Sequence, residues 1–100
     1  MKSFGDLVKQ AQKIQKQMSE VQDRLANDRY EASAGGGLVK AVVDGKQKLI
    51  QLTIQPDALK EEAAVLEDLV LTAVGEAQRT SEERMKEALG PLTGGMSLPF

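Results

Sequence analysis

The sequence predicts an α+β fold in which a long helix comes first, three short antiparallel strands follow, and a second long helix comes last (α-β-β-β-α). Apolar residues recur with helical spacing in residues 3–27, alternate with polar residues in parts of residues 30–54, and return to helical spacing after Pro56. The chain has 100 residues, and a single core stops growing only at roughly 250 to 300 residues, so residues 1–100 are predicted to form one domain.

The amino-acid composition excludes several kinds of chemistry. The chain has no cysteine and no histidine, which excludes disulfides, zinc sites of the Cys/His kind and a histidine general base. With 41% hydrophobic residues but only 3% aromatic ones, the core is expected to be thin and aliphatic, and self-association is expected to supplement it. Because no secretory signal and no run of 18 apolar residues is found, we expect a soluble cytoplasmic protein.

The first predicted helix, residues 3–27, has a stripe of apolar side chains in heptad spacing. Ser3 and Asp6 have the spacing of a capping box, and Asn27 with Asp28 can end the helix. A stripe two side chains wide is typical of a coiled-coil contact, so we expect it to include a second subunit; the alternative is that it packs on the chain's own sheet or second helix. The residues predicted for a dimer interface are Phe4, Leu7, Ala11, Ile14, Met18 and Val21, and Leu25 extends the same stripe.

The middle of the chain predicts three short strands, near residues 30–34, 38–43 and 48–54. Gly35-Gly36-Gly37 predicts a tight turn or bulge between the first two strands, because no Lys-Ser or Lys-Thr of a phosphate-binding loop follows it. Asp44-Gly45 predicts a type I′ hairpin, in which both central residues need positive φ.

The third strand is predicted to be covered on one face only. Ile50, Leu52 and Ile54 alternate along the strand and are expected to face the helices. The other face is expected to be mixed, with Lys48, Leu49, Gln51 and Thr53.

Pro56-Asp57 is predicted to open one long second helix, since proline presets a helical φ and aspartate caps free backbone amides. Apolar spacing then predicts that the first half of this helix lies on the sheet through Leu66, Leu69, Val70, Ala73 and Ala77. From Gln78 to Arg84 the sequence is polar all round, so the helix either projects into solvent or meets other polar surfaces. Gly90-Pro91 is predicted to end it and to leave residues 91–100 as a short C-terminal tail.

Charge is unevenly distributed along the chain. The formal net charge is −2, but residues 1–18 carry +3 and residues 57–100 carry −5. The lysines of the first helix fall on the side opposite its apolar stripe, where their flexible point charges suit DNA phosphates and not the reading of base edges. The predicted DNA-binding residues are Lys2, Lys9, Lys13, Lys16 and Arg79.

The charge distribution alone does not establish DNA binding. Lysines are ordinary residues on a solvated helix surface and need no ligand. The acidic start of the second helix would repel DNA if it lay on the same side as the lysines. Its carboxylates, Glu61, Glu62, Glu67 and Asp68, lack the histidines of a di-metal cage, so no catalytic residue, metal or cofactor is predicted, and we do not expect an enzyme.

Several sequence blocks, taken in order, resemble a known family over essentially the full chain. They are Leu7-Val8-Lys9-Gln10-Ala11-Gln12-Lys13-Ile14-Gln15, Gly35-Gly36-Gly37-Leu38-Val39-Lys40, Ile54-Gln55-Pro56-Asp57-Ala58-Leu59, Leu66-Glu67-Asp68-Leu69-Val70 and Gly95-Met96-Ser97-Leu98-Pro99-Phe100. The chain is similar to the YbaB/EbfC family of bacterial nucleoid-associated DNA-binding proteins. The resemblance implies a homodimer whose helices protrude like the arms of tweezers and engage DNA. Lys9 and Lys13 lie in the matching helix, Lys16 is next to it, and Arg79 is in the matching part of the last helix.

Two functional hypotheses follow. The first is a dimeric, non-catalytic, nucleoid-associated protein that contacts DNA phosphates with little sequence specificity and influences nucleoid organisation or gene expression. The second is a protein-interaction module that binds a replication or repair partner, with DNA contact weak or absent. The acidic second helix and the ending Leu98-Pro99-Phe100 motivate the second hypothesis.

Overall fold

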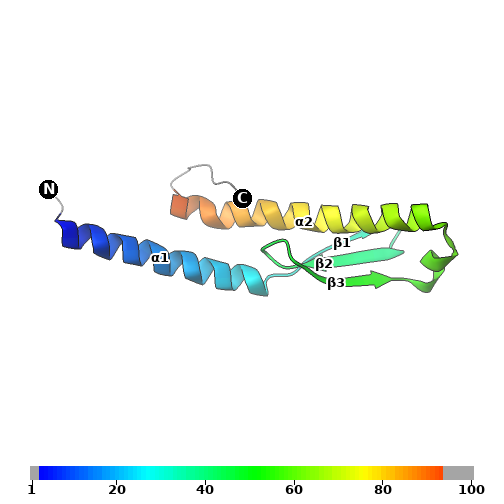
Figure 1. The fold of residues 1–100 in the computed structure, drawn as a ribbon, viewed down its shortest axis with the longest axis horizontal. Helices are drawn as coiled ribbons and strands as arrows, with labels where there is room; N and C mark the ends of the chain where they lie inside the picture. Colours follow the sequence, from blue (N-terminus) through cyan, green and yellow to red (C-terminus); the bar gives the residue numbers. More distant parts are fainter. Residues whose placement is uncertain (1–2, 94–100) are drawn as a thin grey trace.

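The computed structural model describes residues 3–93, which form an elongated molecule with the predicted order of elements (Figure 1). Its extents are 69 × 21 × 16 Å, and its radius of gyration of 19.0 Å exceeds the roughly 13 Å of a compact domain of this length. The first helix reaches far beyond the sheet and accounts for much of this length. The elements are α1 (Phe4–Asn27), β1 (Tyr30–Ala34), β2 (Val39–Val43), β3 (Leu49–Ile54), a short 3-10 helix η1 (Pro56–Lys60) and α2 (Ala63–Thr93).

α1 begins and ends where the sequence predicts. The Ser3 hydroxyl accepts a hydrogen bond from the Asp6 amide at 3.3 Å, which satisfies one of the free amides of the first turn. At the other end the extended backbone of Asp28 stops the helix, and its amide donates to the carbonyls of Arg24 and Leu25. The predicted capping residues therefore set both ends of α1.

The three strands form one antiparallel sheet in the order β1-β2-β3, and α2 packs on β1 and β2. The glycine run confirms the predicted turn between β1 and β2. Gly35, Gly36 and Gly37 have φ values of +65°, +69° and +99°, a region that side-chain-bearing residues rarely adopt. Antiparallel pairing across this turn places Ala34 opposite Val39.

The second hairpin exists as predicted, but the predicted type I′ turn is wrong. The residue with positive φ is Gln47, at +69°, and not Gly45. The connection instead spans the five residues 44–48, and the Asp44 carboxylate stabilises it by accepting from the amides of Lys46 and Lys48 at 2.8 and 3.0 Å. Gly45 is needed for a different reason: its amide donates to the Leu25 carbonyl at 2.7 Å, and a Cβ there would lie 2.5 Å from the same oxygen.

A β-bulge between Val42 and Val43 changes the predicted faces of β3. Leu49 pairs with Val43, whereas Gln51 pairs with Val42, so Ile50 is the extra residue. Leu49 therefore lies on the face of Val43, which is the face that meets α2, and its predicted place on the far face is wrong. Alternation alone could not show this, because one inserted residue reverses the side on which the preceding side chains lie.

The second helix differs from its prediction at both ends. Pro56–Lys60 is the separate helix η1, which buries Ala58 and is followed by extended backbone at Glu61 before α2 begins at Ala63. At the other end α2 continues through Pro91 to Thr93, and the rest of the predicted tail, residues 94–100, lies outside the described residues. In the last turn a proline removes only one backbone hydrogen bond, and Leu92 gains contact with a buried apolar cluster.

The core consists of two separate apolar clusters. One lies between the sheet and the first half of α2 and contains Ala34, Val39, Ala41, Val43, Ala73 and Ala77. The other joins α1 to the second half of α2 and contains Leu25, Met85 and Leu89. The predicted packing of Leu66, Leu69 and Val70 on the sheet is confirmed. The core is thin, as the composition predicts, because each cluster is only two elements deep.

Candidate nucleic-acid interface

The lysines of α1 lie exposed on one side of the helix. Lys9, Lys13 and Lys16 are all solvent-exposed, and within residues 3–93 none of the three takes part in an ion pair. Seven residues separate Lys9 from Lys16, which corresponds to about 10 Å along the helix axis. Lys2, also predicted to bind DNA, lies outside the described residues. We call Lys9, Lys13 and Lys16 the lysine face.

The acidic residues at the start of α2 lie far from the lysine face. Glu61, Glu62, Glu67 and Asp68 are exposed at the start of α2, next to the sheet, whereas α1 extends away from the opposite end of the sheet (Figure 1). The separation greatly exceeds the Debye length of about 8 Å at physiological ionic strength. These carboxylates therefore do not cancel the positive potential at the lysines.

Arg79 is exposed, but the structure does not bring it to the lysine face. Met85 of α2 packs beside Leu25 of α1, and the two helices run in opposite directions (Figure 1). Arg79 lies six residues from Met85 toward the sheet, and Lys16 lies nine residues from Leu25 in the opposite direction. At about 1.5 Å per residue they are roughly 22 Å apart along the helix axes. The neighbouring cations Arg84 and Lys86 form ion pairs with Glu87 and Glu82.

The predicted dimer-interface stripe on α1 has two different surroundings. Phe4, Leu7, Ala11 and Ile14 are exposed, and Phe4 exposes 82% of its surface. Met18 and Val21 are half-buried against the cluster that includes Met85 and Leu89 of the same chain. The C-terminal half of the stripe thus packs on the chain's own second helix, which is the alternative weighed for the whole stripe.

The polar stretch of α2 meets a polar surface of the same chain. Ser81 is fully buried; its hydroxyl donates to the Asp44 carbonyl at 2.7 Å and accepts from the Gln47 amide at 3.0 Å. The Gln78 side-chain amide donates to the Gln47 carbonyl at 3.2 Å. We call Asp44, Gln47, Gln78 and Ser81 the Ser81 cluster.

The Ser81 cluster lies beside the contact between the hairpin turn and α1. It fixes α2 to the turn between β2 and β3, and Gly45 in that turn contacts the backbone of Leu25 in α1. Sequence analysis missed Ser81 and Asp44 as contributors. The available signal was a small hydroxyl residue within an otherwise charged helical stretch, where a buried polar contact replaces the missing apolar stripe.

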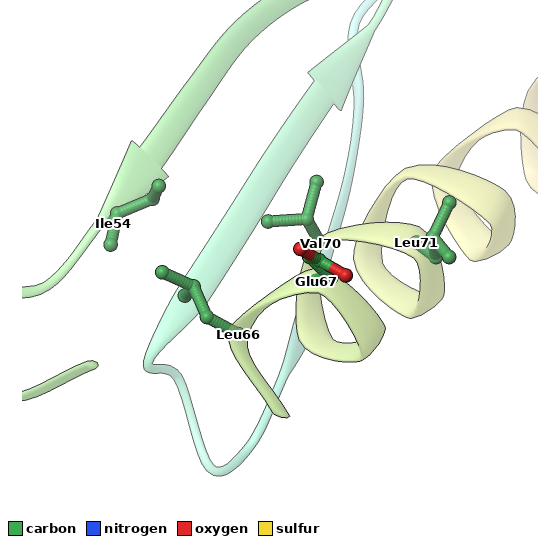
Figure 2. A pocket seen from close by; sticks show the side chains of 5 residues that line it. All are labelled: Ile54, Leu66, Glu67, Val70 and Leu71. Carbon is green, nitrogen blue, oxygen red and sulfur yellow. The ribbon is translucent and has the colours of Figure 1, made fainter. Parts of the chain in front are cut away.

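A second exposed apolar surface lies along β3. Because α2 covers β1 and β2, the side chains Leu49, Ile50, Leu52 and Ile54 remain 38–43% exposed. A hollow of about 460 Å³ between β3 and α2 is lined by Ile54, Leu66, Glu67, Val70 and Leu71 (Figure 2). We call Leu49, Ile50, Leu52, Ile54 and Leu71 the β3 surface.

Within residues 3–93 no group of three or more aspartates or glutamates is placed to hold a metal ion. No helix in the described part of the chain is long and apolar enough to cross a membrane.

Comparison with known proteins gives consistent results. The model of the YbaB/EbfC DNA-binding family matches residues 1–96. A nucleoid-associated protein of Thermoanaerobacter pseudethanolicus is 40% identical over 97% of this chain and 88% of its own length. One from Desulforamulus reducens is 44% identical over 97% of this chain and 93% of its own length. A nucleoid-associated protein of Rickettsia akari is 41% identical over 99% of this chain and 94% of its own length.

Among solved structures, a protein from Helicobacter pylori has the same fold. Its crystal structure matches with a TM-score of 0.84 and covers 94% of this chain and 100% of that chain. The sequence identity is 20%, so this likeness concerns the fold alone.

Proposed function

Because the chain belongs to the YbaB/EbfC DNA-binding family, we propose that it is a nucleoid-associated protein whose lysine face binds the phosphates of double-stranded DNA. Relatives that are 40–44% identical are nucleoid-associated proteins, which supports the same role for this chain. The proposal assigns binding to Lys9, Lys13 and Lys16, with Lys2 continuing the same heptad position. Arg79 is proposed as a separate contact, closer to the sheet.

One observation carries this assignment: three exposed lysines that form no ion pair with any residue of the described range 3–93 stand on the helix that extends away from the acidic start of α2. Each can neutralise one phosphate and release condensed counterions, which provides affinity despite the net charge of −2. The local charge and not the total charge then governs association.

Binding through these lysines is proposed to be tolerant of DNA sequence. A lysine ammonium is a single point charge, whereas the commonest specific base contact is the bidentate one that arginine makes with guanine. Phosphate contacts fix the position of a protein on the duplex and carry no sequence information. Such binding suits a role in nucleoid organisation, with effects on gene expression following from it.

The test is a fluorescence-anisotropy titration of random-sequence duplex DNA at two salt concentrations. The variant K9E/K13E/K16E should lose saturable binding while its circular dichroism and thermal unfolding stay unchanged, because all three side chains are exposed. The matched control is K46E/K48E/K60E, which changes the net charge by the same amount at exposed lysines outside α1. Lys46 and Lys48 lie in the connection between β2 and β3, and Lys60 lies in η1. Equal losses in both variants would show that net charge matters and that the lysine face does not.

We also propose that the chain forms a homodimer and that the β3 surface is its interface. β3 is an open edge strand, and edge strands with exposed apolar side chains readily pair with another chain. A twofold axis beside β3 would pair identical apolar surfaces, as a symmetric dimer requires. The interface predicted on α1 stays a prediction, since Phe4, Leu7, Ala11 and Ile14 are exposed as well.

Light scattering coupled to size-exclusion chromatography separates the two interfaces. L52E should convert dimer to monomer, whereas L7E and the far-face control Q51E should remain dimeric. Monomer formation by L7E with a dimeric L52E would instead assign the interface to α1. A wild-type monomer at every accessible concentration would overturn the dimer proposal.

The second candidate function is a protein-interaction module for a replication or repair partner. The exposed carboxylates at the start of α2 favour it, because they repel DNA and suit a basic protein surface. The DNA titration decides between the two candidates: no binding at low salt by a well-folded wild-type protein would leave the protein partner as the remaining function.

A further inference from the structure

The N-terminal half of α1 presents apolar side chains that no described residue covers. Phe4, Leu7 and Ile14 expose 82%, 53% and 43% of their surface. The same heptad spacing continues at Met18 and beyond, and there the last turns of α2 pack on it. We call Phe4, Leu7, Ala11 and Ile14 the arm stripe.

The residues that flank the arm stripe carry no charge. Val8 and Gln15 border it on one side, and Gln10 borders it on the other. In coiled coils these flanking positions usually carry the charges that select the partner helix. Because the charged side chains of residues 4–15 lie further round the helix, two copies of α1 can approach along the arm stripe without charge repulsion.

Two copies of the arm stripe fit each other when the helices lie antiparallel. Alignment about residue 9 places Leu7 level with Ala11 of the second copy, so that a large side chain faces a small one, and it places Phe4 level with Ile14. Met18, where α2 begins to pack on α1, then falls about 6 Å beyond Phe4 of the second copy. The described parts of the two chains therefore meet along the arm stripe alone, whereas parallel alignment would bring both sheets to the same end.

We propose that the arm stripes of two molecules pair antiparallel on DNA and thereby bridge two separate duplexes. This inference rests on the proposed binding of DNA by the lysine face. Because the lysine face lies opposite the arm stripe, pairing turns the two lysine faces outward, on opposite sides of a helix pair about 20 Å across. That distance exceeds the Debye length of about 8 Å, so the repulsion between the two bound duplexes is largely screened.

The short length of the arm stripe makes this pairing dependent on DNA. Residues 4–14 cover about 15 Å of the helix axis, which is only about one and a half heptads. Coiled coils are usually sustained over at least three to four heptads. The stripes are therefore expected to stay apart in free solution and to pair where bound DNA raises their local concentration.

The test is capture of one duplex by another. A biotinylated duplex held on streptavidin beads should retain a fluorescent duplex of unrelated sequence when wild-type protein is added. L7Q/I14Q should bind a single duplex in the anisotropy titration as the wild type does, because the lysine face is unchanged, but its capture of the second duplex should fall to background. The matched control L7M/I14L keeps both positions apolar and should capture like the wild type.

The outcomes separate this inference from the proposed function. Absence of single-duplex binding by the wild type would overturn both. Single-duplex binding without capture, or equal capture by wild type and L7Q/I14Q, would overturn the bridging inference alone. L52E should still capture the second duplex, since the β3 surface takes no part in the pairing; loss of capture in L52E together with full capture in L7Q/I14Q would assign bridging to the β3 dimer.

Disulfide formation tests the antiparallel alignment, because the chain has no cysteine of its own. In an equal mixture of L7C and A11C on DNA under mild oxidation, links between the two variants should predominate over links between two copies of L7C, since bridged Cα atoms lie about 4.4–6.8 Å apart. Mass spectrometry identifies the linked pairs. Predominant links between two copies of L7C, or the same yield of mixed links without DNA, would contradict DNA-dependent antiparallel pairing.

Discussion

Ser81 shows how one polar side chain can extend the contact between α2 and the sheet beyond the apolar cluster that joins them. It is fully buried in α2 and joins the Asp44 carbonyl and the Gln47 amide of the hairpin turn. Buried polar groups of this kind cost stability when a partner is removed, because the remaining group loses both water and its hydrogen bond. The Ser81 contact is therefore expected to contribute to the stability of the fold.

Replacing Ser81 by alanine should lower the free energy of unfolding by about 1–2 kcal/mol, the usual range for a buried hydrogen bond of this type. Urea denaturation followed by circular dichroism measures the change. The control is T80A, which removes an exposed hydroxyl from the neighbouring position and should change stability by less than about 0.5 kcal/mol. Equal effects of the two substitutions would show that the Ser81 contact contributes nothing.

Tyr30 provides a pH-dependent probe of the native state. Burial raises the pKa of its phenol above the ordinary 10.0, and the nearby Asp28 carboxylate, which accepts the phenol hydrogen bond at 3.2 Å, raises that pKa further. Folding thus favours the neutral phenol. Its contribution to stability is complete below the unfolded pKa of about 10 and is lost as the pH rises through the higher folded pKa.

Absorbance at 295 nm should therefore show Tyr30 ionising at higher pH in the native protein than in urea. The measurement is direct because the chain has one tyrosine and no tryptophan. The free energy of unfolding of the wild type should fall above about pH 10, and Y30F should lack this part of the decrease. Identical titration midpoints in native and unfolded protein would contradict the assignment.

At the scale of elements, Gly45 and Gly36 are required for different physical reasons. A Cβ at Gly45 would lie 2.5 Å from the Leu25 carbonyl oxygen and 2.8 Å from its Cα, so the backbones of the turn and α1 would have to separate. Gly36 has open space around it but a φ of +69°. The first glycine permits a close contact between elements, and the second permits a local backbone conformation.

G45A should accordingly cost more stability than G36A. The expected loss for G36A is about 1–2 kcal/mol from the left-handed backbone, and the loss for G45A should exceed it because backbone atoms must move. Thermal unfolding measures both. Only G45A should also change the near-neighbour signals of α1 in an NMR spectrum, and an undisturbed α1 in that variant would contradict the close contact.

The sequence predicts elements well where the signal is local. Ser3, Asp28 and the glycine run determine helix ends and a turn from their own chemistry, and the structure confirms them. The β3 bulge, the continuation of α2 through Pro91 and the place of Gly45 depend on contacts between elements distant in sequence. Those contacts override local preference, and for that reason alternation and turn signals misplaced Leu49 and the type I′ turn.

The candidate site was predictable in part for the same reason. Heptad spacing places the lysine face opposite the apolar stripe without any tertiary information. The separation of Arg79 from that face depends on how α2 is placed beside α1. Sequence periodicity gives no information about the relative placement of two helices. The β3 surface is likewise a tertiary result, since it exists because α2 covers only two of the three strands.

For the whole molecule, the salt dependence of DNA binding should show whether one lysine face or two lysine faces contact the DNA. Three phosphate contacts predict a slope of log affinity against log salt of about −2.7, and two faces of a dimer engaged together predict about −5.4. Anisotropy titrations over a salt series measure this slope. The dimer-disrupting L52E should show the smaller value, and equal slopes for monomer and dimer would show that only one face binds at a time.

The attachment of α1 at one end has a mechanical consequence. The helix is held from Met18 to Leu25, where it packs on α2 and contacts Gly45, while Lys9 stands about 14 Å beyond Met18 along its axis. A force applied at Lys9 therefore acts as a torque on that joint, with the helix as a stiff lever. The stiffness of the packing of Met18, Val21 and Leu25 on α2, together with the Leu25–Gly45 contact, then sets how far the arm would deflect if bound DNA curved.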